Sequence, residues 1–264
     1  MSNVTHAGLS DQGRVRRQND DYWFADSEMG LYIVADGMGG AVAGGLAAKA
    51  VVEVLPKLLR QKLEGIDKLD NPRASQRVLA ALAEMSDRLQ SEGSTRFGAG
   101  GVGSTVALVL LRDRFALVAH MGDSRVYLLR RGQLEQLTKD HSIVQLLLDN
   151  HEITPEEAAT HPARAQLTRY VGMQGESLPE ARLMKLAAAD RLLLCTDGLS
   201  GMVSDPEVLS ILEEQSDPEA ACRELVAAAN EAGGKDNVTA LVVSIGDLPG
   251  RHILLQSRRF AAPQ

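Results

Sequence analysis

Residues 31–40 read LYIVADGMGG, in which an apolar run stops at the carboxylate of Asp36 and a glycine-rich turn follows. Residues 31–35 have the composition of a buried strand. The stretch RLLLCTDGLSG at 191–201 repeats the pattern and places Asp197 where the first has Asp36. Asp-Gly after a strand is first of all a turn signal. Because both acids follow uninterrupted apolar runs, we also expect them to start at the edge of a core, where a lone carboxylate is costly.

Length and composition limit the classes of protein to which this chain can belong. The chain has 264 residues with 44% hydrophobic content, which is enough for one large domain with a sizeable core. The formal net charge of -7 and the pI near 5.4 disfavour nucleic acid and anionic membranes as partners, because both bind through phosphate neutralisation. Cys195 and Cys222 lie outside any zinc or disulfide spacing, and residues 1–13 lack the apolar core of a signal peptide. We therefore expect a cytoplasmic protein.

The order of predicted elements indicates an α+β fold with antiparallel sheets. Strands are predicted after residues 31–35 at 104–111, 114–120, 125–130, 191–196 and 238–245, and helices at 41–62, 72–92 and 217–232. Thr154 begins a further helix, with Pro155 at its first position and Glu157 completing a capping box. We expect a glycine-rich loop at 91–103 and tight connections at 112–113 and 122–124. The prediction is one catalytic domain over 1–246 and a tail over 247–264.

Several acids could converge on one site. Besides Asp36 and Asp197, candidates are Asp123 and the clusters Asn19-Asp20-Asp21 and Lys235-Asp236-Asn237. If these side chains meet, a divalent metal is the usual way to offset the clustered negative charge. Ligands that are all oxygen favour magnesium, manganese or calcium over zinc.

Sequence motifs of other enzyme classes are absent or incomplete in this chain. The stretch GMGGAV at 37–42 lacks the third glycine of a dinucleotide fingerprint, and the acid before it would repel a pyrophosphate, so a nucleotide-binding oxidoreductase is disfavoured. The chain has no GxxxxGK[ST] and no HExxH, and its two nearest matches to GxSxG miss the last glycine. Cys195 has no arginine six residues later, as a cysteine-phosphatase loop would require.

Seven motifs together resemble one known family. They appear in the order and spacing of the metal-dependent Ser/Thr protein phosphatases (PPM, or type 2C), especially the compact bacterial members: VRRQNDD, VADGMGG, GVGST, HMGDSRVYLL, LTKDHS, LLLCTDGLS and GGKDNVT. The resemblance covers roughly residues 3–246. It implies two antiparallel sheets packed as a sandwich with helices on both outer sides (αββα). It also implies a pair of Mn2+ or Mg2+ ions at one edge of that sandwich.

The resemblance assigns roles to particular residues. Asp36 would bridge both ions, and the Gly37 carbonyl would join the second. Asp20 stands where the family usually has Glu, so we expect it to reach the second ion through water. The remaining implied roles belong to Asp197 and Asp236 as ligands of the first ion, Asp123 with Asp197 at a third ion, Asp21 orienting metal-bound water, and Arg16 binding phosphate.

The implied reaction is hydrolysis of phosphoserine and phosphothreonine in proteins, opposite a cognate Ser/Thr kinase. Water activated by the two ions would attack phosphorus in line, without a phosphoenzyme intermediate. Many eukaryotic members have a histidine two residues after the bridging Asp as a candidate acid, but here Met38 is in that place. The general acid is therefore open: water is the default, and His141 and His161 are alternatives that are more often structural.

The segment at about 143–183 corresponds to the family's flap, where we expect substrate preference to reside. Ser142, at its start, is either a helix cap or a contact to a third ion, and a cap is the simpler interpretation. Two further functions stay open. One is a catalytically silent domain that binds phosphoprotein or metal. The other is a regulator in an anti-sigma antagonist pathway, with the same chemistry but one phosphoserine partner.

Overall fold

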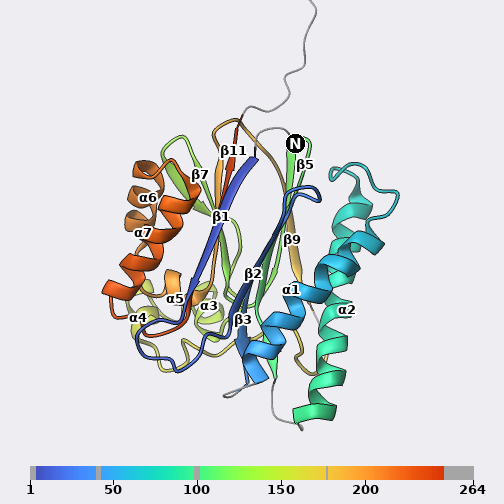
Figure 1. Cartoon of the computed structure of the whole chain (residues 1–264). Coiled ribbons are helices and arrows are strands. Elements are labelled where there is room, and N and C mark those ends of the chain that lie inside the picture. Colours follow the sequence, from blue (N-terminus) through green and yellow to red (C-terminus); the bar gives the residue numbers. More distant parts are fainter. Residues whose placement is uncertain (1–3, 40–42, 98–101, 177, 247–264) are drawn as a thin grey trace, which may run out of the picture.

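Two antiparallel β-sheets pack face to face, and helices cover the outer side of each sheet (Figure 1). The structure is a computed structural model that describes residues 4–39, 43–97, 102–176 and 178–246. Helices α1 and α2 lie against one sheet and α6 and α7 against the other, so the layers run helix, sheet, sheet, helix (Figure 1). The predicted αββα sandwich is confirmed.

Each sheet mixes strands that are far apart in the sequence. The first sheet has the order β1 (Val4–Asp11), β11 (Val238–Ile245), β10 (Arg191–Cys195), β7 (Arg125–Arg130) and β8 (Gln133–Gln136). The second has the order β2 (Asp21–Asp26), β3 (Leu31–Met38), β5 (Val106–Arg112), β6 (Phe115–Met121) and β9 (Glu180–Lys185), and β4 (Gly103–Ser104) pairs with the end of β3.

Seven helices complete the part of the chain that the structure describes. They are α1 (Ala43–Lys62), α2 (Pro72–Phe97), α3 (Ile143–Asp149), α4 (Pro155–Thr160), α5 (Asp197–Ser200), α6 (Asp205–Glu214) and α7 (Pro218–Glu231). The capping box predicted at Thr154 begins α4, and the Ser142 side chain caps α3 by accepting from the Gln145 backbone N–H. Among those residues, no helix is both long and apolar enough to cross a membrane.

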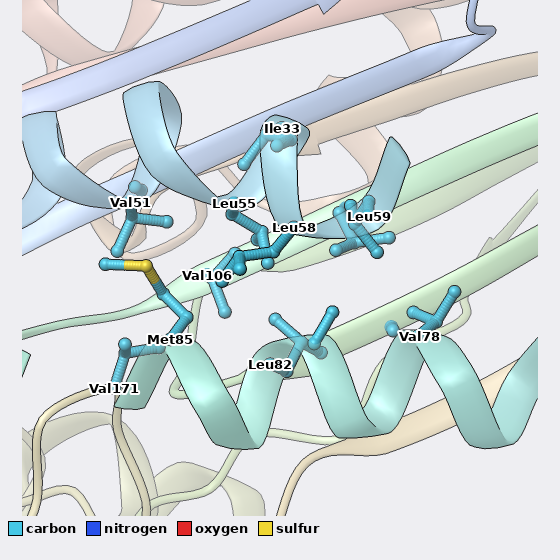
Figure 2. Packing of buried hydrophobic residues seen from close by; sticks show 14 of the residues in the cluster. Ile33, Val51, Leu55, Leu58, Leu59, Val78, Leu82, Met85, Val106 and Val171 are labelled. Atoms are coloured by element: carbon cyan, nitrogen blue, oxygen red, sulfur yellow. The ribbon is translucent and has the colours of Figure 1, made fainter. Parts of the chain in front are cut away.

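The pleat of β3 explains why its sequence is apolar throughout and where its carboxylate points. Leu31, Ile33 and Ala35 pack against α1 and α2, whereas Tyr32 and Val34 pack in the layer between the two sheets. Figure 2 shows the helix side of this strand, where Ile33 lies among leucines of α1 and α2. Because successive side chains alternate between faces, Asp36 continues the inner series and points between the sheets.

Two local expectations were wrong, and a third was right in length but joins different sheets. Strand β3 does not stop at residue 35, because Gly37 and Met38 pair with Ser104 and Gly103, so Asp36 lies within the strand. Helix α2 continues to Phe97, so residues 91–97 are helical rather than loop; one interior glycine costs a helix only about 1 kcal/mol. Residues 122–124 form the expected tight connection between β6 and β7, but these strands belong to different sheets, so the chain crosses between the two layers there.

Other elements escaped prediction or lie outside the described residues. Strands β8 and β9 are edge strands with polar, partly exposed residues, and β1 and β2 lack strong periodicity. Helix α6 was missed although Val208, Ile211 and Leu212 recur at helical spacing. The two-residue hairpin turn after Arg112 is present, with Asp113 at φ 53°. The predicted helix start at 41–42, the loop at 98–101 and the tail at 247–264 are outside the part of the chain that is described.

The core between α1 and the second sheet gives a test of the fold. Leu55 of α1 is 0% exposed, whereas Leu46 of the same helix is 47% exposed. We predict that Leu55→Ala lowers the free energy of unfolding by about 3 kcal/mol, because a buried Leu→Ala change loses transfer free energy and leaves a cavity. Leu46→Ala should change it by less than about 1 kcal/mol. Urea denaturation followed by circular dichroism measures both, and equal losses would contradict this packing.

Candidate active site

One cavity of about 510 Å3 gathers most of the predicted site residues. Its lining includes seven of the eight, namely Arg16, Asp20, Asp36, Gly37, Asp123, Asp197 and Asp236. We call it the acidic cavity. Asp21, the eighth residue, is buried next to it and is not part of the lining. Ala165, Leu167 and Tyr170 also line the cavity, so the segment predicted as a flap lies beside these acids.

Hydrogen bonds fix the backbone around Asp36. Its N–H donates to the Thr105 hydroxyl at 3.0 Å, and its carbonyl accepts from the Thr105 N–H at 2.8 Å. The next residue, Gly37, lies so close to Gly44 of α1 that a Cβ at Gly37 would overlap the Gly44 carbonyl. Glycine at both positions therefore lets α1 pack onto the end of β3 and leaves the Gly37 backbone open to the cavity.

A second close approach brings Asp197 and Asp236 together. Asp197 begins α5 directly after β10, and Asp236 lies two residues before β11, the neighbour of β10 in the sheet. A Cβ on Gly198 would overlap the Asn237 carbonyl, so only glycine allows these two segments to meet. Burial raises the pKa of Asp197, and repulsion by the nearby Asp236 carboxylate raises it further.

Asn237 ties the 12–20 loop to the cavity. Its amide group donates to the carbonyls of Gln12 and Gln18, each at 2.9 Å, and its Oδ1 accepts from the Asp20 N–H at 2.9 Å. The Asp20 carboxylate accepts from the Gln18 amide at 2.9 Å. The loop that carries Arg16 and Asp20 is therefore held in place by a residue from the far end of the chain.

Arg16 stands at the rim of the cavity. Its side chain is 55% exposed, and its Nη2 donates to Asp236 Oδ2 at 2.5 Å. The hydrogen bond to Asp236 is the main cause that raises the pKa of Arg16, and the nearby Asp36 and Asp197 contribute as well. A guanidinium presents several donors in a fixed fork, so donors remain for an oxyanion in the cavity.

Asp21 links the two sheets beneath the cavity. It lies opposite Asp36 in the β2–β3 register, and its Oδ2 accepts from the hydroxyls of Thr196 and Thr239, each at 2.8 Å. Both threonines come from the other sheet. Its Oδ1 is buried without a hydrogen-bond partner. Burial raises the pKa of Asp21 to about 7, although the two hydroxyls oppose the shift.

The cavity concentrates uncompensated negative charge. Burial, and then repulsion by Asp21 and Asp197, raises the pKa of Asp36 well above its ordinary value. Burial and the charge of Asp197 raise the pKa of Asp123 to about 8. Asp197 Oδ1, like Asp21 Oδ1, is buried without a partner. Unpaired buried oxygens and converging carboxylates are what a divalent cation satisfies, and an all-oxygen set suits Mn2+ or Mg2+.

A second cluster of metal-type ligands lies elsewhere. Ligand atoms of His120, His141 and Glu180 all come within 4.8 Å of one another. Arg169, however, donates to Glu180 at 2.6 Å and lies 3.4 Å from the His141 ring, so a cation already compensates this carboxylate. His120 is bonded to the Lys139 carbonyl at 2.8 Å. We interpret this cluster as structural.

Neither histidine weighed as a general acid reaches the acidic cavity. His141 is buried, accepts from the Gly122 N–H and stacks on the His120 ring at 4.4 Å. Burial lowers the pKa of His141 to about 4, which disfavours a proton-carrying role at neutral pH. His161 accepts from the Ala163 N–H in a local turn. Met38 does line the cavity but has no proton to give.

Sequence reasoning missed how three residues organise the site. It gave no role to Thr196 or Thr239, which hold Asp21, and it named Asn237 only as a member of the cluster at 235–237, although Asn237 holds the 12–20 loop. A signal for the two threonines was available: they continue the inward series of β10 and β11, where the other inward residues are aliphatic. A hydroxyl at such a position needs a partner across the sandwich.

Comparison with known proteins identifies the family. A sequence model described as "Protein phosphatase 2C" matches residues 12–233. The chain belongs to the protein phosphatase 2C family. It is 40% identical over 255 residues to the serine/threonine protein phosphatase PstP of Mycobacterium tuberculosis, covering 94% of this chain but only 47% of PstP. It is 33% identical over 243 residues to protein phosphatase PhpP of Streptococcus pneumoniae, covering 90% of this chain and 96% of PhpP.

Solved structures agree with this assignment. The catalytic domain of PstP in complex with two manganese ions aligns with a TM-score of 0.78 at 35% identity, covering 92% of this chain and 99% of that one. PppA of Pseudomonas aeruginosa, described as a regulatory component of T6SS, aligns with a TM-score of 0.81 at 35% identity over 92% of this chain and 99% of that one. The chain thus has the fold of the 2C phosphatases and spans about half the length of PstP.

The raised carboxyl pKa values of this 2C-family site predict a pH dependence of stability. In the presence of a chelator, so that no metal is bound, the folded protein keeps a proton on Asp21 up to a pH of about 7 and on Asp123 up to a pH of about 8. The unfolded chain has already released both protons at those pH values. The unfolded state then binds fewer protons, so the free energy of unfolding should fall as pH rises. The buried His141, with its lowered pKa, works in the opposite direction only below about 6.5. Urea melts in chelator between pH about 6.5 and 8 measure this slope, and a rise over that range would contradict it.

Glycine at position 198 gives a second prediction. Gly198→Ala should separate Asp197 from Asp236, because the new methyl group overlaps the Asn237 backbone. We expect Mn2+ affinity, measured by isothermal titration calorimetry, to fall about tenfold or more, in the range seen when the support of a metal ligand is lost. Circular dichroism should show a folded protein. Unchanged affinity in a folded variant would contradict the contact.

Proposed function

We propose that this chain is a metal-dependent protein phosphatase acting on phosphoserine and phosphothreonine. The observation that carries the proposal is the convergence of Asp36, Asp197 and Asp236 in one cavity that Arg16 borders. The 2C relatives support it, since PstP and PhpP are named as protein phosphatases. The acids would hold cations, and the arginine would hold the phosphate that those cations attract.

We propose two Mn2+ or Mg2+ ions per chain, in keeping with the two manganese ions of the PstP structure. Asp36 would contact both ions, and the Gly37 carbonyl and Asp20 would complete the second site. Asp197 and Asp236 would complete the first, and Asp123 with Asp197 could hold a third. When bound, the ions supply Lewis acidity that makes water acidic enough to attack at neutral pH and offsets charge on the phosphate.

The chain's own side chains would bind and orient the reactants. Arg16 would fork two donors onto phosphate oxygens and offset charge that develops on them. Asp21, whose Oδ1 is buried without a partner next to the acidic cavity, would orient water held at the ions. Among the described residues, no Ser, Cys or His side chain lines the acidic cavity, and the Thr105 hydroxyl that does line it is already bonded to the Asp36 N–H and to Ser124. The carboxylates of the cavity would hold the cations, so we propose direct attack by water without a phosphoenzyme.

The leaving alkoxide of the substrate needs a proton. Met38 occupies the position next to the cavity where a histidine could have acted, and no histidine lines the cavity in the part of the chain that is described. We therefore assign this proton to a water molecule in the cavity. Such a donor predicts no histidine-like limb in the pH profile of kcat.

We further propose that the chain counteracts a Ser/Thr protein kinase by removing the phosphate that the kinase adds. A cytoplasmic location is consistent with Cys195 and Cys222, which are both buried free thiols. The identity of the phosphoprotein would be set outside the acidic cavity, by the surfaces that border it.

Two substitutions test the proposed roles. Asp36→Asn should lower kcat for an aryl phosphate by about a hundredfold or more, because one side chain serves both ions. Arg16→Ala should lower kcat/KM by about tenfold to a hundredfold, the value of charged hydrogen bonds to phosphate. The assay uses purified protein with Mn2+ and with chelator.

Asp87→Asn, an exposed carboxylate on α2, is the matched control and should keep full activity. Full activity of Asp36→Asn or Arg16→Ala would remove that residue from the mechanism. If the wild-type protein binds Mn2+ but turns over neither an aryl phosphate nor a phosphothreonine peptide, the chain is a silent binding domain instead.

A further inference from the structure

A second cavity of about 650 Å3 adjoins the acidic cavity. The two share Arg16, Asp123, Ala165, Asp197 and Asp236 in their linings. A substrate peptide whose phosphate lies in the acidic cavity can therefore place a neighbouring residue in the second cavity. We call it the flap cavity, because α3 and α4 of the 143–183 segment form one of its sides.

The flap cavity has an aliphatic wall. Val144 and Leu148 of α3 and Ala158 of α4 line it from the flap, and Met202, just after α5, lines it from the body. None of these four side chains is fully buried, and neither α3 nor α4 contains a buried residue. Apolar area that remains in contact with water is stabilised when an apolar group covers it.

The same cavity has a cationic rim. Arg164 and Lys235 line it, are exposed, and have no ion pair with any residue that the structure describes. Arg125 also lines the cavity, but Asp140 neutralises it through bonds of 2.9 and 2.7 Å. The free positive charges therefore lie at Arg164 and Lys235, and they complement acidic residues in an occupant.

We propose that the flap cavity is a substrate subsite that binds an aliphatic side chain next to the phosphorylated residue, in a segment that also carries acidic residues. This inference rests on the proposed phosphatase function and names the substrate class for it. The lining supplies no aromatic ring within the described residues, so stacking on aromatic groups is absent and aliphatic contact dominates. Arg164 and Lys235 bind the acidic residues of the substrate segment, and Arg16 binds its phosphate.

A peptide series tests the subsite with the wild-type protein. Phosphothreonine peptides of equal length and charge carry Leu or Ser at each position flanking the phosphothreonine, and a parallel set replaces nearby Glu with Gln. We expect Leu at one flanking position to raise kcat/KM about tenfold over Ser, as partial burial of an aliphatic side chain implies. We expect Glu to be favoured over Gln at low salt. Equal kcat/KM values across the Leu and Ser peptides would overturn the proposal.

Substitutions in the flap cavity test whether the preference for Leu over Ser peptides arises there. Leu148→Ser on the flap and Met202→Ala on the body should each reduce the Leu-to-Ser preference, expressed relative to turnover of an aryl phosphate. Leu146→Ser is the matched control, because Leu146 is on the same helix, is 50% exposed and does not line the cavity. It should keep the wild-type preference. Loss of the preference in Leu146→Ser alone would place the subsite elsewhere and overturn the proposal.

Failure of the subsite proposal can be distinguished from failure of the proposed phosphatase function. If the aryl phosphate is not hydrolysed, the phosphatase function fails, and the subsite is then tested by binding of the same fluorescent peptides in the presence of Mn2+. Tighter binding of Leu peptides that weakens in both Leu148→Ser and Met202→Ala would still support the subsite. Equal affinities for Leu and Ser peptides would overturn it.

Discussion

The hydrogen bonds that Thr196 and Thr239 donate to Asp21 join the two sheets at the edge where the acids gather. Asp21 lies opposite Asp36 in its own sheet, so this link sets how far Asp36 is from the acids that follow β10 and precede β11. The rest of the acidic cavity depends on that spacing. A buried carboxylate with two hydroxyl donors is well enough satisfied to persist, yet its second oxygen stays available to the site.

The same arrangement is electrostatically unfavourable unless positive charge is supplied. Burial and mutual repulsion raise the pKa values of Asp36, Asp123 and Asp197 together, which means that the folded chain resists ionising them all. The fold nevertheless brings them close through glycine contacts at Gly37 and Gly198, where any side chain would collide. A site in which the fold holds mutually repelling carboxylates close together is typical of a site that functions with a bound cation.

The αββα sandwich and the roles of the eight site residues followed from the seven motifs that resemble the family, and the structure brings seven of the eight to one cavity. The strand-end acids by themselves indicated only that several carboxylates could converge. Prediction from the sequence failed where tertiary pairing overrides local signals. Asp-Gly at 36–37 resembled a strand end, but pairing with β4 extends the strand. Residues 122–124 were predicted as a tight connection, which they are, but only the assignment of β6 and β7 to different sheets shows that Asp123 lies on a crossing between layers. Thr196 and Thr239 carried a signal for a partner across the sandwich, but neither their partner nor the partners of Asn237 could be identified, since those partners are up to 225 residues away in sequence.

The most direct test of this account is a crystal structure grown with Mn2+ and measured at a wavelength where manganese scatters anomalously. The account predicts at least two anomalous peaks inside the acidic cavity, both next to Asp36, with Asp197 and Asp236 beside one of them. No peak should appear at the His120, His141 and Glu180 cluster, because Arg169 already compensates it. Anomalous density at that cluster with none beside Asp36 would contradict the account.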